Sequence, residues 1–123
     1  MFSPLEIATN YVDIGTKKGK MSATKTLLLG IFAGMFIAFG GIASTAASAT
    51  LEGSMAKVVS GLVFPAGLAM VLMAGSELFT GDNLVIIALL EKKIRFRDLM
   101  KNWVCVFFGN FIGAILVTLL VVY

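Results

Sequence analysis

The chain has 123 residues, of which 59% are hydrophobic and 14% charged, and its formal net charge is +3. Soluble domains average about 25% charged residues, so this composition excludes an ordinary soluble domain, and it is far too apolar for a disordered chain. A single cysteine excludes an internal disulfide framework, and the lack of histidine removes the commonest metal ligand and general base. We therefore expect an all-α, polytopic membrane protein without a metal or a cofactor.

Residues 1–23 predict a short helix ahead of the first membrane span. Ser3 fits the N-cap, Pro4 the first helical position, and Glu6 completes a capping-box pattern. Apolar residues then recur at helical spacing, so that one face lies on the membrane surface or plugs a cytoplasmic opening. An interfacial anchor is the simpler interpretation, and a role in gating is the alternative.

Residues 24–123 predict a domain of three membrane spans. The first span covers about residues 24–50, which at about 1.5 Å per residue reach roughly 40 Å, enough to cross a hydrocarbon core of about 30 Å. The third span covers about residues 102–123, which contain no charge, and Trp103 stands at its start as an interfacial anchor would.

The middle segment, about residues 58–90, predicts one crossing that is broken at residues 77–83. The seven apolar residues Leu84–Leu90 reach only about 10 Å as a helix and cannot cross alone. With a single crossing here, nine of the ten basic residues fall on one side, and Lys57 is the exception. The positive-inside rule makes that side the cytoplasm, which predicts a multi-pass cell-membrane protein with a cytoplasmic N-terminus. The basic residues flank apolar spans, so a nucleic-acid partner is not expected.

Two carboxylates stand at the break. Near the membrane interior, Glu77 and Asp82 cost several kcal/mol unless they find partners, and exposed backbone groups face the same problem. We expect Asp82 to cap a helix that begins near Leu84, and Glu77 to accept hydrogen bonds from amides of the loop. The loop also holds residues that supply polar groups or tight-turn backbone angles: Gly75, Thr80, Gly81 and Asn83.

A broken helix has a possible use in transport. The helix that starts after the break aims its N–H groups and positive dipole end into the membrane, which favours an anion. Discontinuous helices of this kind mark binding sites in transport proteins. The alternative is that Pro65 and the glycines only kink the helix, with both carboxylates at an interface. Composition alone does not choose between the two.

Small residues predict close helix contacts in the first and third spans. Gly30 and Gly34 form one small-xxx-small face, and Gly109 and Gly113 form the other. Asn110 lies between the second pair of glycines. We expect it to hydrogen-bond across a helix interface rather than to contact a substrate.

The segment LMAGSELFTG at residues 72–81 resembles the signature of the formate/nitrite transporter family. Residues 57–67 (KVVSGLVFPAG) and 101–114 (KNWVCVFFGNFIGA) are similar to the corresponding parts of the second and third helices of that family. The resemblance extends over essentially the whole chain.

This resemblance implies an aquaporin-like fold of six spans in two inverted repeats, of which the chain provides one. It also implies a pore in each protomer of a homo-pentamer, and a substrate that is a small monovalent anion such as formate, nitrite or hydrosulfide, with or without a proton. Residues 77–83 would then be the pore loop. By the same resemblance the pathway is lined by Phe64, Leu68, Leu78, Phe79 and Thr80, although plain core packing is the alternative for Phe64 and Leu68.

The family's fourth to sixth spans, with a second broken helix, a central pore histidine and a nearby lysine, have no counterpart in this sequence. We expect a fragment, with a second chain supplying the missing half as the alternative. A different class of function is a non-transporting subunit that assembles with a larger membrane complex. An enzyme is not expected, because Glu77 and Asp82 could form an acid–base pair but no nucleophile or cofactor motif accompanies them.

Overall fold

The computed structural model describes residues 1–123, which fold into helices without any strand. The elements in chain order are α1 (Pro4–Lys20), α2 (Ala23–Ser48), α3 (Gly53–Val63), α4 (Pro65–Ala74), α5 (Phe79–Asp82), the 3₁₀ turn η1 (Asn83–Val85), α6 (Ile86–Leu90) and α7 (Phe96–Val122). The expected all-α class is confirmed.

Three apolar helical stretches are long enough to cross a membrane: Ala23–Ser48, Gly53–Ala74 and Phe96–Val122. A shorter apolar stretch, Phe79–Leu90, follows the second one after the break. The second and third of these stretches begin earlier than the predicted spans, at Gly53 and Phe96. α7 begins at Phe96, within the charged segment, because the Arg95 N–H donates to Asp98 Oδ2 at 3.1 Å and so caps the helix there.

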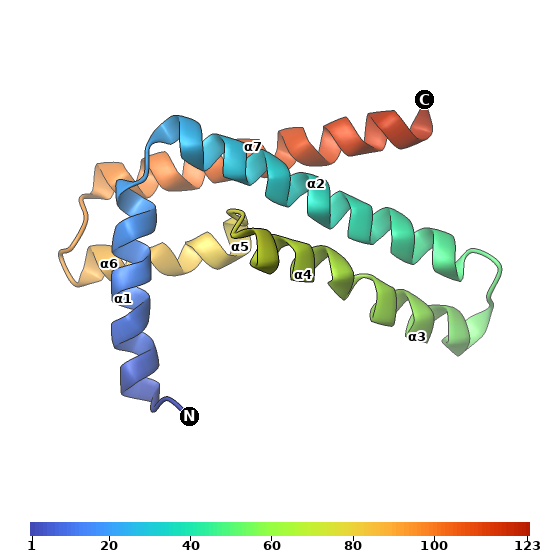
Figure 1. Ribbon diagram of the computed structural model, residues 1–123, viewed down its shortest axis with the longest axis horizontal. Coiled ribbons are helices and arrows are strands. Elements are labelled where there is room, and N and C mark those ends of the chain that lie inside the picture. Colours follow the sequence, from blue (N-terminus) through green and yellow to red (C-terminus); the bar gives the residue numbers. More distant parts are fainter.

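α2 is the central element (Figure 1). Its first half packs against α7, and its second half packs against α3 and α4. Glycines make both contacts close. A Cβ atom at Gly109 would lie 3.0 Å from the Gly30 Cα, and one at Gly40 would lie 2.9 Å from the Gly67 Cα. These contacts require helices without side chains at the crossing, so van der Waals packing between backbones holds the three spans together.

α1 lies across the broken helix rather than apart from it (Figure 1). The predicted capping box is present, with Ser3 N–H donating to Glu6 Oε2 at 2.6 Å and Glu6 N–H to Ser3 Oγ at 3.3 Å. These bonds lower the pKa of Glu6. Near the other end of α1, Gly15 is buried, and a Cβ atom there would lie 3.1 Å from the Ala88 Cβ. The apolar face of α1 therefore contacts η1 and α6.

Much of the apolar surface is uncovered in this chain. Only 21 of the 123 residues are buried, and the exposed ones include large side chains on α4 and α7, such as Leu72, Phe107 and Phe111. An exposed apolar surface of this extent fits contact with lipid or with further protein. The buried core beneath α1 is small: Val85, Ala88, Ile94 and Leu99.

Candidate functional site

The second apolar stretch breaks after α4. Gly75 adopts a left-handed conformation (φ 64°), and the Ser76 N–H donates back to the Val71 carbonyl at 3.0 Å, which ends the helix. The chain is extended at Leu78 and becomes helical again at Phe79. The prediction of a helix start near Leu84 is therefore wrong. The Leu78 carbonyl accepts from the N–H groups of both Gly81 and Asp82 at 3.0 Å, and this starts the helical turn earlier.

The two carboxylates at the break share one cation from α1. Lys18 Nζ lies 2.7 Å from Glu77 Oε2 and 2.7 Å from Asp82 Oδ1, and the Asp82 side chain is fully buried. Asp82 makes no helix-capping bond, so its predicted capping role is wrong, and the Glu77 side chain pairs with Lys18 instead of with loop amides. An ammonium group compensates a buried carboxylate more strongly than a neutral amide does.

α1 also holds the loop through a tyrosine. The Tyr11 hydroxyl donates to the Gly81 carbonyl at 2.9 Å, and burial raises the pKa of Tyr11. Burial by itself would lower the pKa of Lys18, but the hydrogen bonds and negative charges of Asp82 and Glu77 outweigh it and raise the pKa. Both groups therefore stay protonated at neutral pH, and both bind the loop as donors.

Asn110 ties the loop to the crossing of α2 and α7. Its Nδ2 donates to the Gly30 carbonyl at 2.8 Å and to the Glu77 carbonyl at 2.9 Å, while its Oδ1 accepts from the Phe79 N–H at 2.9 Å. One side chain thus satisfies two backbone groups of the break, the Phe79 N–H and the Glu77 carbonyl, and joins them to α2 through Gly30. The bond to Gly30 spans a helix interface, which is the contact that the sequence predicts for Asn110.

Trp103 and Phe79 close the other side of the loop. Trp103 Nε1 donates to the Asp82 carbonyl at 3.0 Å, so this indole binds the loop. From its place at the start of the third span, the sequence predicts an interfacial anchor instead. The Phe79 ring packs edge-on against Trp103 and Phe107, with ring centroids 6.4 and 5.6 Å apart. Phe79 is therefore fixed against α7.

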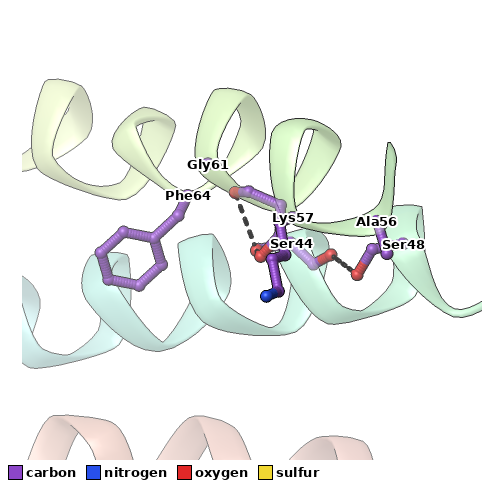
Figure 2. Close-up of a pocket in the computed structure, with 7 residues that line it drawn as sticks. Ser44, Ser48, Ala56, Lys57, Gly61 and Phe64 are labelled. Carbon is purple, nitrogen blue, oxygen red and sulfur yellow. Dashed lines mark hydrogen bonds between the residues drawn. The ribbon is translucent and has the colours of Figure 1, made fainter. Parts of the chain in front are cut away.

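The structure brings three of the five predicted lining residues together. Leu68, Leu78 and Thr80 border a cavity of about 160 Å³, and Lys18 borders the same cavity. Leu78 also borders a larger apolar hollow of about 330 Å³ between α2 and α7, together with Phe79. Phe64 lies apart from them, in a separate hollow between α2 and α3 (Figure 2).

Comparison with known proteins identifies the family of the chain. Residues 5–123 match the profile described as "Formate/nitrite transporter". The chain belongs to the formate/nitrite transporter family. It is 37% identical over 118 residues to the formate channel BtFdhC of Bacillus thuringiensis. The aligned residues cover 93% of this chain and 46% of the relative.

Two further relatives come from Escherichia coli and Plasmodium falciparum. The chain is 36% identical over 120 residues to the formate channel FocA of Escherichia coli K12, covering 95% of this chain and 42% of the relative. It is 33% identical over 114 residues to the formate-nitrite transporter of Plasmodium falciparum, covering 85% of this chain and 37% of the relative. The chain therefore spans less than half of the length of these members of the formate/nitrite transporter family.

In this family member, some predicted loop residues have other roles than expected. Gly75 needs its left-handed angle, whereas Gly81 has no positive φ and open space around its Cα, so the predicted need for glycine there is wrong. Asn83 begins η1 and makes no side-chain hydrogen bond. Lys18 and Tyr11 are not among the residues that the sequence predicts at the loop. The available signal was their position on the apolar face of α1, in register with Gly15.

Proposed function

We propose that this chain is one part of a membrane channel, namely a part that contains a broken helix. The channel conducts small monovalent anions of weak acids, with formate and nitrite as the first candidates. Membership of the formate/nitrite transporter family supports this proposal, and so do relatives that are named formate channel and formate-nitrite transporter. One structural observation carries it. A helix is interrupted among apolar spans, and Lys18 and Asn110 hold the interruption in place.

Such a loop has a cost that a mere scaffold would avoid. Buried charges require partners, and backbone groups outside a helix must be satisfied within the membrane. The chain dedicates residues from α1 and α7 to these needs at a single loop. Irregular backbone at membrane depth is tolerated where protein buries it or where it lines a water-filled cavity. Leu78 and Thr80 border a cavity, which agrees with transport better than with a non-transporting subunit.

In the proposed pathway, the wall carries both apolar and polar groups. Leu68, Leu78 and Phe64 supply apolar surface that keeps water out, so that a bare ion crosses only where polar groups assist it. Thr80 supplies a hydroxyl group in the same cavity as Leu68 and Leu78. A weak-acid anion has a second route, because it can take up a proton and cross the apolar surface as the neutral acid. Hydrosulfide shares this chemistry with formate and nitrite.

We further propose that the protein lies in the cell membrane with its N-terminus in the cytoplasm, as the distribution of basic residues favours. A second repeat and neighbouring protomers, in a ring of five, would cover the exposed apolar side chains of α4 and α7. The proposal includes no enzymatic step.

Uptake of formate and nitrite into liposomes that contain this chain together with the second repeat tests this function. We expect flux well above that of empty liposomes, with changed rate and formate-to-nitrite preference in Leu78→Ala and Thr80→Ala. Leu120→Ala is the control, because Leu120 is 78% exposed near the end of α7, far from the loop along the chain. Absence of flux would support the non-transporting subunit. Flux that is unchanged in both loop variants would remove these residues from the pathway.

A further inference from the structure

Basic side chains gather at the turn between α6 and α7, residues 91–95 (Figure 1). In Figure 1 this turn is at the end of the bundle opposite the turn that joins α2 to α3. The turn and the start of α7 carry four exposed basic residues: Lys92, Lys93, Arg95 and Arg97. From the sequence alone they indicate only the side of the membrane on which the turn lies.

None of these four side chains forms an ion pair within the chain, because both ion pairs of the chain belong to Lys18. Two acidic residues are close to them in sequence. Asp98 accepts the Arg95 backbone N–H at 3.1 Å, and Glu91 is exposed just after α6. The positive charges are therefore available to an anionic group outside the chain.

α1 adds two further basic residues. Gly19 and Ile94 are buried against each other, since a Cβ atom at Gly19 would lie 3.0 Å from the Ile94 Cδ1. This contact places the last turn of α1 beside the turn between α6 and α7. That last turn carries Lys17 and Lys20, which are exposed, whereas Lys18 is bound to the two carboxylates of the loop. We call Lys17, Lys20 and the four basic residues at the start of α7 the basic surface.

Lys92 has an unusual backbone conformation. It is the only residue other than glycine with a positive φ, which is 57°. Its N–H donates to the Leu89 carbonyl at 3.0 Å, and the Lys93 N–H donates to the Ala88 carbonyl at 2.9 Å, so that α6 ends here. Glycine is the usual residue at such a helix end, because a Cβ atom is unfavourable in the left-handed region. A lysine at this position therefore costs stability, and this indicates that its charged side chain has a use.

Large apolar side chains flank the basic residues. Phe96 stands between Arg95 and Arg97 and is 63% exposed, and Leu90, at the end of α6, is 72% exposed. α7 is long and apolar enough to cross a membrane, and it begins at Phe96. The basic surface therefore lies where an apolar span meets water, which is the depth of lipid headgroups. At this depth an apolar side chain can contact acyl chains while a neighbouring basic side chain reaches a phosphate group.

From this arrangement we infer that the basic surface binds the headgroup of an anionic phospholipid, with Arg95 and Arg97 on the phosphate and Phe96 against the acyl chains. Arginine presents its donors in a planar fork that matches phosphate oxygens. Clusters of about four to eight basic residues beside a membrane span attract anionic lipids, and the basic surface has six. The exposed Phe96 favours a lipid over a free phosphate, which has no apolar part. The inference goes beyond the proposed function, because it concerns the surrounding lipid and not the transported anion.

Competition between two lipids tests the site in the protein that contains this chain together with the second repeat. In micelles with equal amounts of phosphatidylglycerol and phosphatidylcholine, native mass spectrometry counts the lipids that stay bound. We expect the wild type to retain phosphatidylglycerol in preference, and the double variant Arg95→Gln with Arg97→Gln to lower the ratio of the two lipids at least about threefold. Arg97→Gln alone lowers the ratio about twofold. Lys57→Gln removes the same charge at the opposite end of the bundle and leaves the ratio unchanged. An equal ratio in the wild type and the double variant overturns the inference.

Two soluble competitors distinguish the lipid from other anions. Inorganic phosphate at millimolar concentration leaves the lipid ratio of the wild type unchanged, because it cannot replace the contact of the acyl chains with Phe96. Displacement of phosphatidylglycerol by phosphate overturns the assignment to a lipid. A wild type that binds polyglutamate but shows no preference between the two lipids also overturns it, in favour of an acidic protein as the partner.

Substitutions of Lys92 separate its charge from its backbone conformation. Lys92→Gly removes the strain and the ammonium group together, so we expect a higher unfolding temperature than that of the wild type in phosphatidylcholine. In phosphatidylglycerol this advantage shrinks or reverses, because a lipid that binds the folded state stabilises the wild type more. Lys92→Gln keeps the strain, so it loses the stabilisation by phosphatidylglycerol without any gain in phosphatidylcholine. Equal effects of Lys92→Gly in the two lipids show that the charge has no role at the lipid and overturn the inference.

Discussion

Lys18 and Asp82 lie 64 positions apart in the sequence, yet Lys18 Nζ and Asp82 Oδ1 are 2.7 Å apart. Asp82 is fully buried, and its second oxygen, Oδ2, has no hydrogen-bond partner. Lys18 is thus the principal compensation for a negative charge beneath the N-terminal helix. Through this pair and the pair with Glu77, Lys18 joins α1 to the loop at residues 77–83.

The first prediction concerns removal of this cation. Lys18→Met keeps the length of the side chain but leaves Asp82 and Glu77 without a counter-charge. Breaking a buried ion pair costs about 3–5 kcal/mol, and we expect the lower end of this range because the Lys18 side chain is 22% exposed. Thermal unfolding of the detergent-solubilised protein measures the loss. Lys17→Met is the matched control, since Lys17 is exposed and makes no ion pair.

The double variant Lys18→Met with Asp82→Asn completes this test. Neutralising Asp82 removes the unpaired charge, so we expect it to recover part of the stability lost in Lys18→Met. If the two substitutions are simply additive, the pair does not couple α1 to the loop.

A second prediction concerns alkaline pH. The pKa of Lys18 is raised above its ordinary value of 10.5, so its pairing with the carboxylates is complete below that pH and is lost as the pH rises through the raised value. The pKa of Tyr11 is also raised above its ordinary 10.0, so its bond to Gly81 is lost in the same direction. The contact between α1 and the loop should therefore weaken as the pH rises above about 10.

Fluorescence of Trp103, the only tryptophan, reports on this contact because its indole binds the loop at Asp82. We expect an alkaline transition in the wild type and a smaller one in either Lys18→Met or Tyr11→Phe. The double variant that combines Lys18→Met with Tyr11→Phe should show none. An identical alkaline transition in the double variant would assign the signal to other groups.

The contrast between α7 and α1 shows what the sequence could predict. Hydrophobicity and small-residue spacing predict the three spans, the glycine faces of α2 and α7, and the bond from Asn110 across a helix interface. The partner of Asp82 could not be found in the same way. Three lysines close the last turn of α1, and a charge count does not distinguish them. Only Lys18 shares the face of Tyr11 and Gly15, and it reaches the loop because α1 lies across α6.

The position of the helix restart escaped prediction for a related reason. A sequence pattern placed it near Leu84, because polar residues dominate before that position. The backbone instead starts to turn at Phe79, where the Asn110 side chain accepts the first free N–H group. A distant side chain therefore decides where the short helix begins, and no local propensity contains that information.

A third prediction concerns Asn110. Asn110→Ala leaves the Phe79 N–H and the Glu77 carbonyl without a partner and removes the bond that ties them to the Gly30 carbonyl of α2. Each unsatisfied buried polar group costs about 1–3 kcal/mol, so we expect a loss of several kcal/mol and loss of formate uptake together. Thr118→Ala is the control on the same helix, because Thr118 bonds only to the carbonyl of Ala114 in its own helix. A stable Asn110→Ala variant with unchanged uptake would show that water replaces the side chain.

A fourth prediction concerns the crossing of α2 and α7. A Cβ atom at Gly34 would overlap the backbone carbonyl of Asn110, and backbone cannot move aside as a side-chain tip can. Gly34→Ala must push the helices apart, and overpacking of this kind costs about 1–3 kcal/mol. The separation also draws Asn110 away from Gly30, so the loop loosens with the crossing. Hydrogen exchange at Glu77 and Phe79 should rise together with the loss in thermal stability.

Gly61→Ala provides the comparison, because open space surrounds Gly61 and the methyl group meets nothing. Equal stability of the two alanine variants would mean that the crossing is not close-packed in the membrane.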